Sequence, residues 1–65
     1  MKWLEAQSFL STGRVAARTD WPEDTYVEFD EGSLCVFSES DPEGTPYTPD
    51  DDDKAADDWF VVGVA

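Results

Sequence analysis

The sequence lacks histidine and contains one cysteine, Cys35, among its 65 residues. A single cysteine cannot form an intramolecular disulfide, and there is no Cys or His cluster that could bind zinc. Without a histidine, Cys35 has no obvious base to activate it, and we interpret it as a small core residue of a strand. The sequence therefore predicts no catalytic residue, no metal site and no cofactor, and we do not expect an enzyme.

Basic residues are scarce. The chain has four Lys and Arg against sixteen Asp and Glu, which gives a formal net charge of −12. Because a nucleic-acid binder needs the opposite sign, no nucleic-acid partner is expected. Three interpretations of the acids remain: a solvated acidic surface, an inhibitor that mimics DNA, or charge without a specific role. With so many carboxylates some must lie close together, so proximity alone does not indicate acid–base catalysis.

Long apolar segments are also missing. No stretch approaches the roughly 18 apolar residues of a membrane-spanning helix, and residues 1–5 have no signal-peptide core. We therefore expect a soluble protein in the cytoplasm (that of a host cell if the chain is viral), with no membrane partner. A single domain over residues 1–65, without disulfide or metal, is marginally stable alone, so oligomerisation is expected to stabilise it. Three Trp, two Tyr and four Phe indicate a folded domain rather than an acidic disordered tail.

The spacing of apolar and turn-forming residues predicts a helix followed by short strands. Trp3, Ala6 and Leu10 share one face of an amphipathic helix over residues 3–12, which Gly13 ends. Strands are expected at 14–18, 25–29, 34–37 and 59–64, with a hairpin turn at 30–33 and loops at 19–24 and 38–46.

A short helix is expected before the last strand. Thr48 or Asp50 can cap it, Pro49 suits its first turn, and Asp50 with Asp53 approximates a capping box. Trp59 begins the most apolar run of the chain and is assigned to the core. The predicted fold is α+β: an N-terminal helix packed on a small antiparallel β-sheet, with a short helical turn before the last strand.

The segment around this short helix carries a resemblance to a known family. Its pattern is Tyr47-Thr48-Pro49, Asp53, Ala56, Asp58-Trp59 and Val61-Val62, preceded in the first half of the chain by Gly13, Arg14, Arg18 and Trp21. This ordered set resembles the Thoeris anti-defence type 2 proteins, small phage-encoded sponges that sequester nucleotide immune signals. The family usually has Trp at the position of Tyr47, Ser at that of Asp50, and Asn-Gly in place of Pro22-Glu23.

The resemblance implies a homo-oligomer, a tetramer or a dimer, that binds a cyclic nucleotide signal without cleaving it. The signal would be a cyclised ADP-ribose of the Thoeris type or a cyclic dinucleotide. An acidic inhibitor that mimics DNA or blocks another protein is the alternative, and a domain of this fold that has lost ligand binding is a third possibility. A DNA mimic needs carboxylates spaced like phosphates along one face, whereas a sponge needs a concave aromatic pocket.

The predicted ligand site centres on two aromatic residues at the ends of elements. We expect Trp21 and Tyr47 to lie close together at one edge of the sheet, within one subunit or across a subunit boundary, and to hold a purine between or against their faces. Asp50 and Asp53 would accept hydrogen bonds from the ribose or the base. The remaining candidates are Tyr26, as a further aromatic residue, and Arg18, one of few cations able to meet a phosphate.

Overall fold

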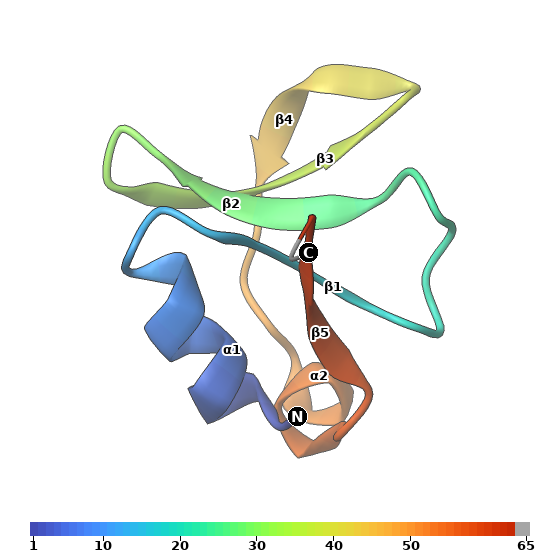
Figure 1. Ribbon diagram of the computed structural model, residues 1–65. Helices are drawn as coiled ribbons and strands as arrows, with labels where there is room; N and C mark the ends of the chain where they lie inside the picture. The colour runs from blue at the N-terminus through green and yellow to red at the C-terminus, as the bar shows by residue number, and fades with distance from the viewer. Residues whose placement is uncertain (64–65) are drawn as a thin grey trace.

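The structure, a computed structural model, describes residues 1–63 and consists of one helix packed on a five-stranded antiparallel sheet, with a second short helix (Figure 1). In chain order the elements are α1 (Trp3–Leu10), β1 (Val15–Arg18), β2 (Tyr26–Asp30), β3 (Ser33–Ser38), β4 (Asp41–Pro46), α2 (Asp51–Ala55) and β5 (Trp59–Val62). The strands lie in the order β4-β3-β2-β1-β5, so the last strand pairs with the first. This arrangement confirms the predicted α+β fold. Val64, the end of the predicted last strand, lies outside the described residues.

The core lies between α1 and one face of the sheet, at β1, β2 and β5. The buried residues of this cluster come from the helix (Trp3, Ala6, Leu10) and from the strands (Ala16, Val27, Trp59). Because side chains alternate along a strand, Ala16 and Trp59 point toward the helix, whereas Ala17 and Phe60 point to the opposite face. Trp59 is 2% exposed, which confirms its assignment to the core, while Phe60 on the opposite face is 40% exposed.

The hairpin between β2 and β3 has the predicted turn. Asp30 pairs with Ser33, and the two residues between them have positive φ angles, 53° at Glu31 and 85° at Gly32. Two consecutive positive φ angles are typical of a type I′ turn, whose twist matches that of the flanking strands. Glycine adopts such angles at no steric cost, so Gly32 supports the sharp reversal.

The prediction of a loop over residues 38–46 is wrong in part, because residues 41–46 form the edge strand β4. Two prolines and a glycine argued against a strand, but an edge strand tolerates proline because one side of its backbone needs no partner. Gly44 has a φ of 87°, and a Cβ atom there would lie 2.5 Å from the ring of Phe37. Cys35, predicted in the core, is half-buried on β3 opposite Pro46.

The end of the first helix and the start of the second differ from the prediction. α1 ends at Leu10 rather than at residue 12, and its last turn closes on Gly13, whose amide donates to the Leu10 carbonyl. At α2, Asp50 is the cap and accepts a hydrogen bond from the Asp53 amide at 2.8 Å, so Pro49 precedes the cap instead of occupying the first turn. No helix among residues 1–63 is long and apolar enough to cross a membrane.

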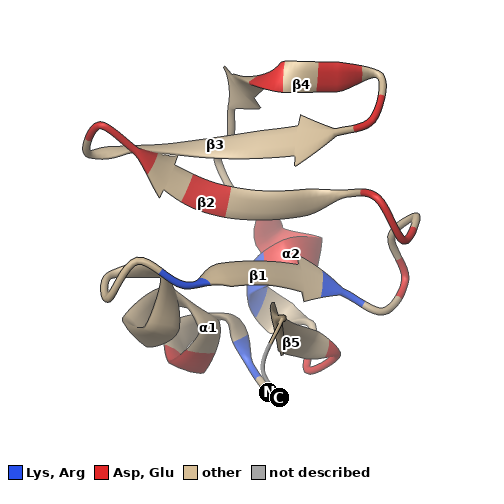
Figure 2. Ribbon diagram, turned by 45° about the horizontal axis from the view of Figure 1, so that its top comes forward, with Lys and Arg blue, Asp and Glu red and all other residues tan. Residues whose placement is uncertain are grey.

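Charge is distributed unevenly over this fold. Residues 19–53 contain thirteen of the sixteen acids and no Lys or Arg. Figure 2 shows acidic residues along β2, β4 and the turns between strands, whereas the basic residues lie near α1, at the ends of β1 and on α2. The basic residues are Lys2, Arg14, Arg18 and Lys54. Any cationic side chain beside β2, β3 or β4 must therefore come from a residue before position 19 or after position 53.

Candidate functional site

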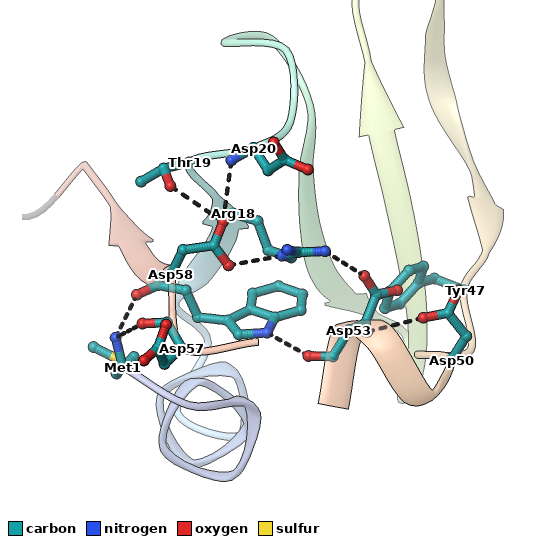
Figure 3. A network of polar contacts seen from close by, with 10 residues as sticks. Met1, Arg18, Thr19, Asp20, Tyr47, Asp50, Asp53, Asp57 and Asp58 are labelled. Carbon is teal, nitrogen blue, oxygen red and sulfur yellow. Dashed lines mark hydrogen bonds and ion pairs between the residues drawn. The ribbon is translucent and has the colours of Figure 1, made fainter. Parts of the chain in front are cut away.

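Arg18, the last residue of β1, joins three segments that are distant in the sequence (Figure 3). Its Nε donates to Asp58 at 2.8 Å and its Nη1 donates to Asp53 at 3.0 Å. The side chains of Arg18 and Asp53 are 16% and 14% exposed, and that of Asp58 is 25% exposed. The hydrogen bond from Arg18 holds the pKa of Asp58 below its usual range, and the Asp58 carboxylate in turn raises the pKa of Arg18. Arg18 and Asp58 are therefore both charged at neutral pH.

Asp53 is the second centre of this network. Its other carboxylate oxygen accepts a hydrogen bond from the Tyr47 hydroxyl at 2.6 Å, and its backbone carbonyl accepts one from Trp59 Nε1 at 2.8 Å. Burial, together with the Asp53 carboxylate, raises the pKa of the Tyr47 phenol, which therefore stays protonated. The expected capping box is consequently one-sided, because the Asp53 side chain turns to Tyr47 and Arg18 rather than back to its cap.

Asp58 fixes the start of the loop that follows β1. Besides Arg18, it accepts hydrogen bonds from the Thr19 hydroxyl at 3.1 Å and from the Asp20 amide at 3.2 Å. Trp21 comes next, and its amide donates to the Arg18 carbonyl at 3.0 Å. Sequence reasoning did not select Asp58 as a site residue. The available signal was its place directly before Trp59 in the pattern that carries the family resemblance.

Trp21 and Tyr47 lie close together, with ring centroids 5.9 Å apart, but their planes meet at 79° in an edge-to-face contact. Trp21 also meets Trp59 edge to face at 5.1 Å, and Tyr47 meets Trp3 at 6.4 Å. This packing leaves no slot between the Trp21 and Tyr47 faces for a purine. Within one subunit this geometry favours stacking of a base against one ring over stacking between the two. The faces of the separate rings remain the candidates for stacking.

A hollow of about 270 Å³ lies on the sheet face opposite α1, beside the loop between β1 and β2. Trp21, Tyr26 and Phe60 supply aromatic walls, and Arg18 with Glu23 supplies the charged groups. The hollow brings together three of the six predicted site residues, namely Arg18, Trp21 and Tyr26. The other three, Tyr47, Asp50 and Asp53, are not among its lining residues and belong to the hydrogen-bonded segment behind Arg18.

Tyr26 has one ring face covered. Its ring stacks on Phe37 with centroids 5.4 Å apart and an interplanar angle of 19°. Each of the two residues stands opposite the other in the β2–β3 ladder, on the same sheet face as the hollow. The stacking therefore fixes the orientation of the Tyr26 ring where it borders the hollow.

A second, larger and more open groove of about 710 Å³ lies on the helix side of the sheet. Its walls include Trp3 and Leu4 of α1, Phe29 and Leu34 of the β2–β3 hairpin, and Lys54 of α2. None of the six predicted site residues lines this groove. Within residues 1–63 there is no group of three or more Cys, Asp or Glu side chains placed to hold a metal ion.

The chain is a small α+β domain with a hollow lined by aromatic residues on one sheet face. The chain belongs to the Tad2-like family, the Thoeris anti-defense 2-like domains, whose profile matches residues 1–62. No curated protein and no solved structure has significant similarity to the chain. The family relationship confirms the resemblance seen in the sequence and supports a role in evading Thoeris defence.

Proposed function

We propose that this protein binds a cyclic nucleotide immune signal and sequesters it intact. The observation that carries the proposal is the meeting of Arg18, Trp21 and Tyr26 in one hollow, in a chain of the Thoeris anti-defense 2-like family. The signal would be a cyclised ADP-ribose or a cyclic dinucleotide. Stoichiometric capture of the signal keeps it from its effector, so no chemical step is required of the protein.

Stacking on aromatic side chains would supply most of the affinity. The Trp21 ring is held from behind by edge-to-face contacts with Tyr47 and Trp59, so its position is fixed before a ligand arrives. A base that stacks on a fixed aromatic face gains about 1–3 kcal/mol, because little conformational entropy is lost. Phe60 is 40% exposed on the same side of the sheet and offers a further apolar surface.

Capture without cleavage also agrees with the chemistry of the hollow. A nucleophilic mechanism needs a nucleophile and a base within hydrogen-bond reach of each other. Cys35 is not a lining residue of the hollow, and the Arg18 guanidinium is already paired with two carboxylates. The proposal therefore assigns the site residues to binding alone.

The function is tested by calorimetry with a panel of cyclic nucleotides, namely cyclised ADP-ribose species and cyclic dinucleotides, with linear ADP-ribose as the control. We expect saturable binding of at least one cyclic ligand and recovery of that ligand unchanged, as measured by mass spectrometry. Heat of binding followed by loss of the ligand would indicate an enzyme. Binding of none of the ligands would contradict the proposal and leave the acidic inhibitor as the prediction to test.

We further propose that the protein assembles into a dimer or a tetramer. Among residues 1–63, four large apolar side chains are exposed: Leu4 by 75%, Phe9 by 42%, Phe60 by 40% and Val62 by 39%. Phe9 lies on α1 and is not a lining residue of the hollow, so a second copy that packs against this part of the helix would bury it and leave the hollow open. Light scattering at micromolar concentration is expected to give at least twice the monomer mass. A monomer mass would contradict this proposal.

A further inference from the structure

The charges around the hollow bear on which part of a ligand can enter it. We propose that the hollow receives the base and sugar of a nucleotide and keeps the phosphates outside, so that each added phosphate charge weakens binding. This inference rests on the proposed function and concerns the same site. It follows from how the Arg18 guanidinium is paired.

Arg18 is the only Lys or Arg among the described lining residues, and its positive charge is already more than balanced. Asp58 and Asp53 accept hydrogen bonds from its Nε and Nη1 at 2.8 and 3.0 Å, and Glu23 adds a third carboxylate on the rim. One guanidinium therefore stands against three carboxylates. A phosphate that approaches the hollow meets a local excess of two negative charges, in addition to the charge of −12 on the whole chain.

The geometry of Arg18 also limits what it can offer to a phosphate. A guanidinium binds phosphate most strongly through two parallel N–H groups on one edge. Nη2 is the one nitrogen of Arg18 without a hydrogen-bond partner among residues 1–63. A phosphate at the Nε edge would have to displace Asp58, and one at the Nη1–Nη2 edge would have to share the guanidinium with the two carboxylates already bound to it. We therefore assign Arg18 to holding the wall of the hollow, in place of the phosphate contact expected from the sequence.

The size and lining of the hollow fit the neutral part of a nucleotide. Its volume of about 270 Å³ is slightly below the ordinary range for drug-sized ligands, so a part of a cyclic nucleotide fits and the remainder stays outside. Trp21 and Phe60 offer apolar surface to a base, and the Thr19 and Thr25 hydroxyl oxygens can accept hydrogen bonds from amino or hydroxyl groups.

Coulomb's law gives the size of the expected discrimination. A phosphate charge about 8 Å from two excess negative charges in water is penalised by about fivefold in affinity at low salt. At physiological salt, where the screening length is about 8 Å, the penalty falls to about twofold. Raising the salt concentration should therefore strengthen binding of a phosphate-bearing ligand and leave an uncharged one almost unchanged.

The test compares two variants with the same change in net charge, Glu23→Gln at the rim of the hollow and Glu43→Gln on the exposed edge strand β4. The dissociation constants of adenosine and cyclic ADP-ribose are measured by calorimetry at about 20 mM and about 300 mM salt. We expect Glu23→Gln to tighten binding of cyclic ADP-ribose about fivefold at low salt, because the probe carries two phosphate charges. We expect less than a twofold change for adenosine, for Glu43→Gln, or at high salt.

Weaker binding of cyclic ADP-ribose at higher salt, or weaker binding by Glu23→Gln, would overturn the inference and leave the proposed function standing. An equal gain in Glu23→Gln and Glu43→Gln would also overturn it, because the effect would then come from net charge and not from the hollow. If the parent binds neither probe and no cyclic dinucleotide, the proposed function itself fails.

Discussion

Replacing Trp59 with alanine is expected to unfold the protein at room temperature. The side chain is 2% exposed, and its Nε1 donates to the Asp53 carbonyl. Its ring centroid lies 4.9 Å from that of Trp3 and 5.1 Å from that of Trp21. Removing a buried tryptophan costs about 3–5 kcal/mol through the cavity it leaves. A domain this small has a total stability of about the same size. The loss also leaves the Asp53 carbonyl without its indole donor.

The measurement for this prediction is urea denaturation followed by circular dichroism. Leu4→Ala serves as the control, because Leu4 is 75% exposed and lies on the same helix as Trp3. We expect the control to change the denaturation midpoint little, while Trp59→Ala lacks a cooperative transition. If the two variants had similar midpoints, the central place of Trp59 in the core would be wrong.

Replacing Arg18 with methionine is expected to lower the melting temperature by about 5–10 °C. The substitution keeps most of the side-chain volume but leaves Asp53 and Asp58 close together without their shared cation. The cost should exceed that of an exposed ion pair, because all three side chains are mostly buried, and fall below that of a fully buried pair. Arg14→Met is the control, since Arg14 is exposed and the change in net charge is the same.

The pH dependence of this second prediction has a defined sign. The pKa of Asp58 is lowered in the folded state by its hydrogen bond from Arg18. A lowered pKa contributes stability that is present above the unfolded pKa, near 4, and is lost as the pH falls through the folded pKa. The advantage of the parent over Arg18→Met should therefore be full at pH 7 and shrink below about pH 4. A difference in melting temperature that stays constant down to pH 2 would contradict this account.

The spacing of apolar residues predicted the elements well where burial in the fold follows that spacing. The helix face of Trp3, Ala6 and Leu10 and the core position of Trp59 follow from apolar spacing, and both are confirmed. β4 was missed because its prolines were weighed without knowing that the strand lies at the edge of the sheet. Edge position is a property of the whole sheet, so no local pattern in residues 41–46 could reveal it.

At the candidate site, too, local sequence patterns could not predict contacts that depend on the whole fold. Asp53 was interpreted through its neighbour Asp50, three residues away, whereas its side chain pairs with Arg18, which lies 35 residues away. The closeness of Trp21 and Tyr47 was predicted, but their edge-to-face contact depends on how Trp3 and Trp59 fill the core beside them. The hollow lies on the other sheet face, and its position required the pairing of β5 with β1.

The position of the binding site can be tested with the three tryptophans, because each lies in a different part of the molecule. Trp21 lines the hollow, Trp3 lines the second groove, and Trp59 lies in the core between them. The measurement is the NMR shift of the three indole N–H signals during titration with the cyclic nucleotide that binds in calorimetry. The account predicts the largest shift at Trp21, a small one at Trp59 and almost none at Trp3. The largest shift at Trp3, or no shift at Trp21 under saturating ligand, would contradict the account.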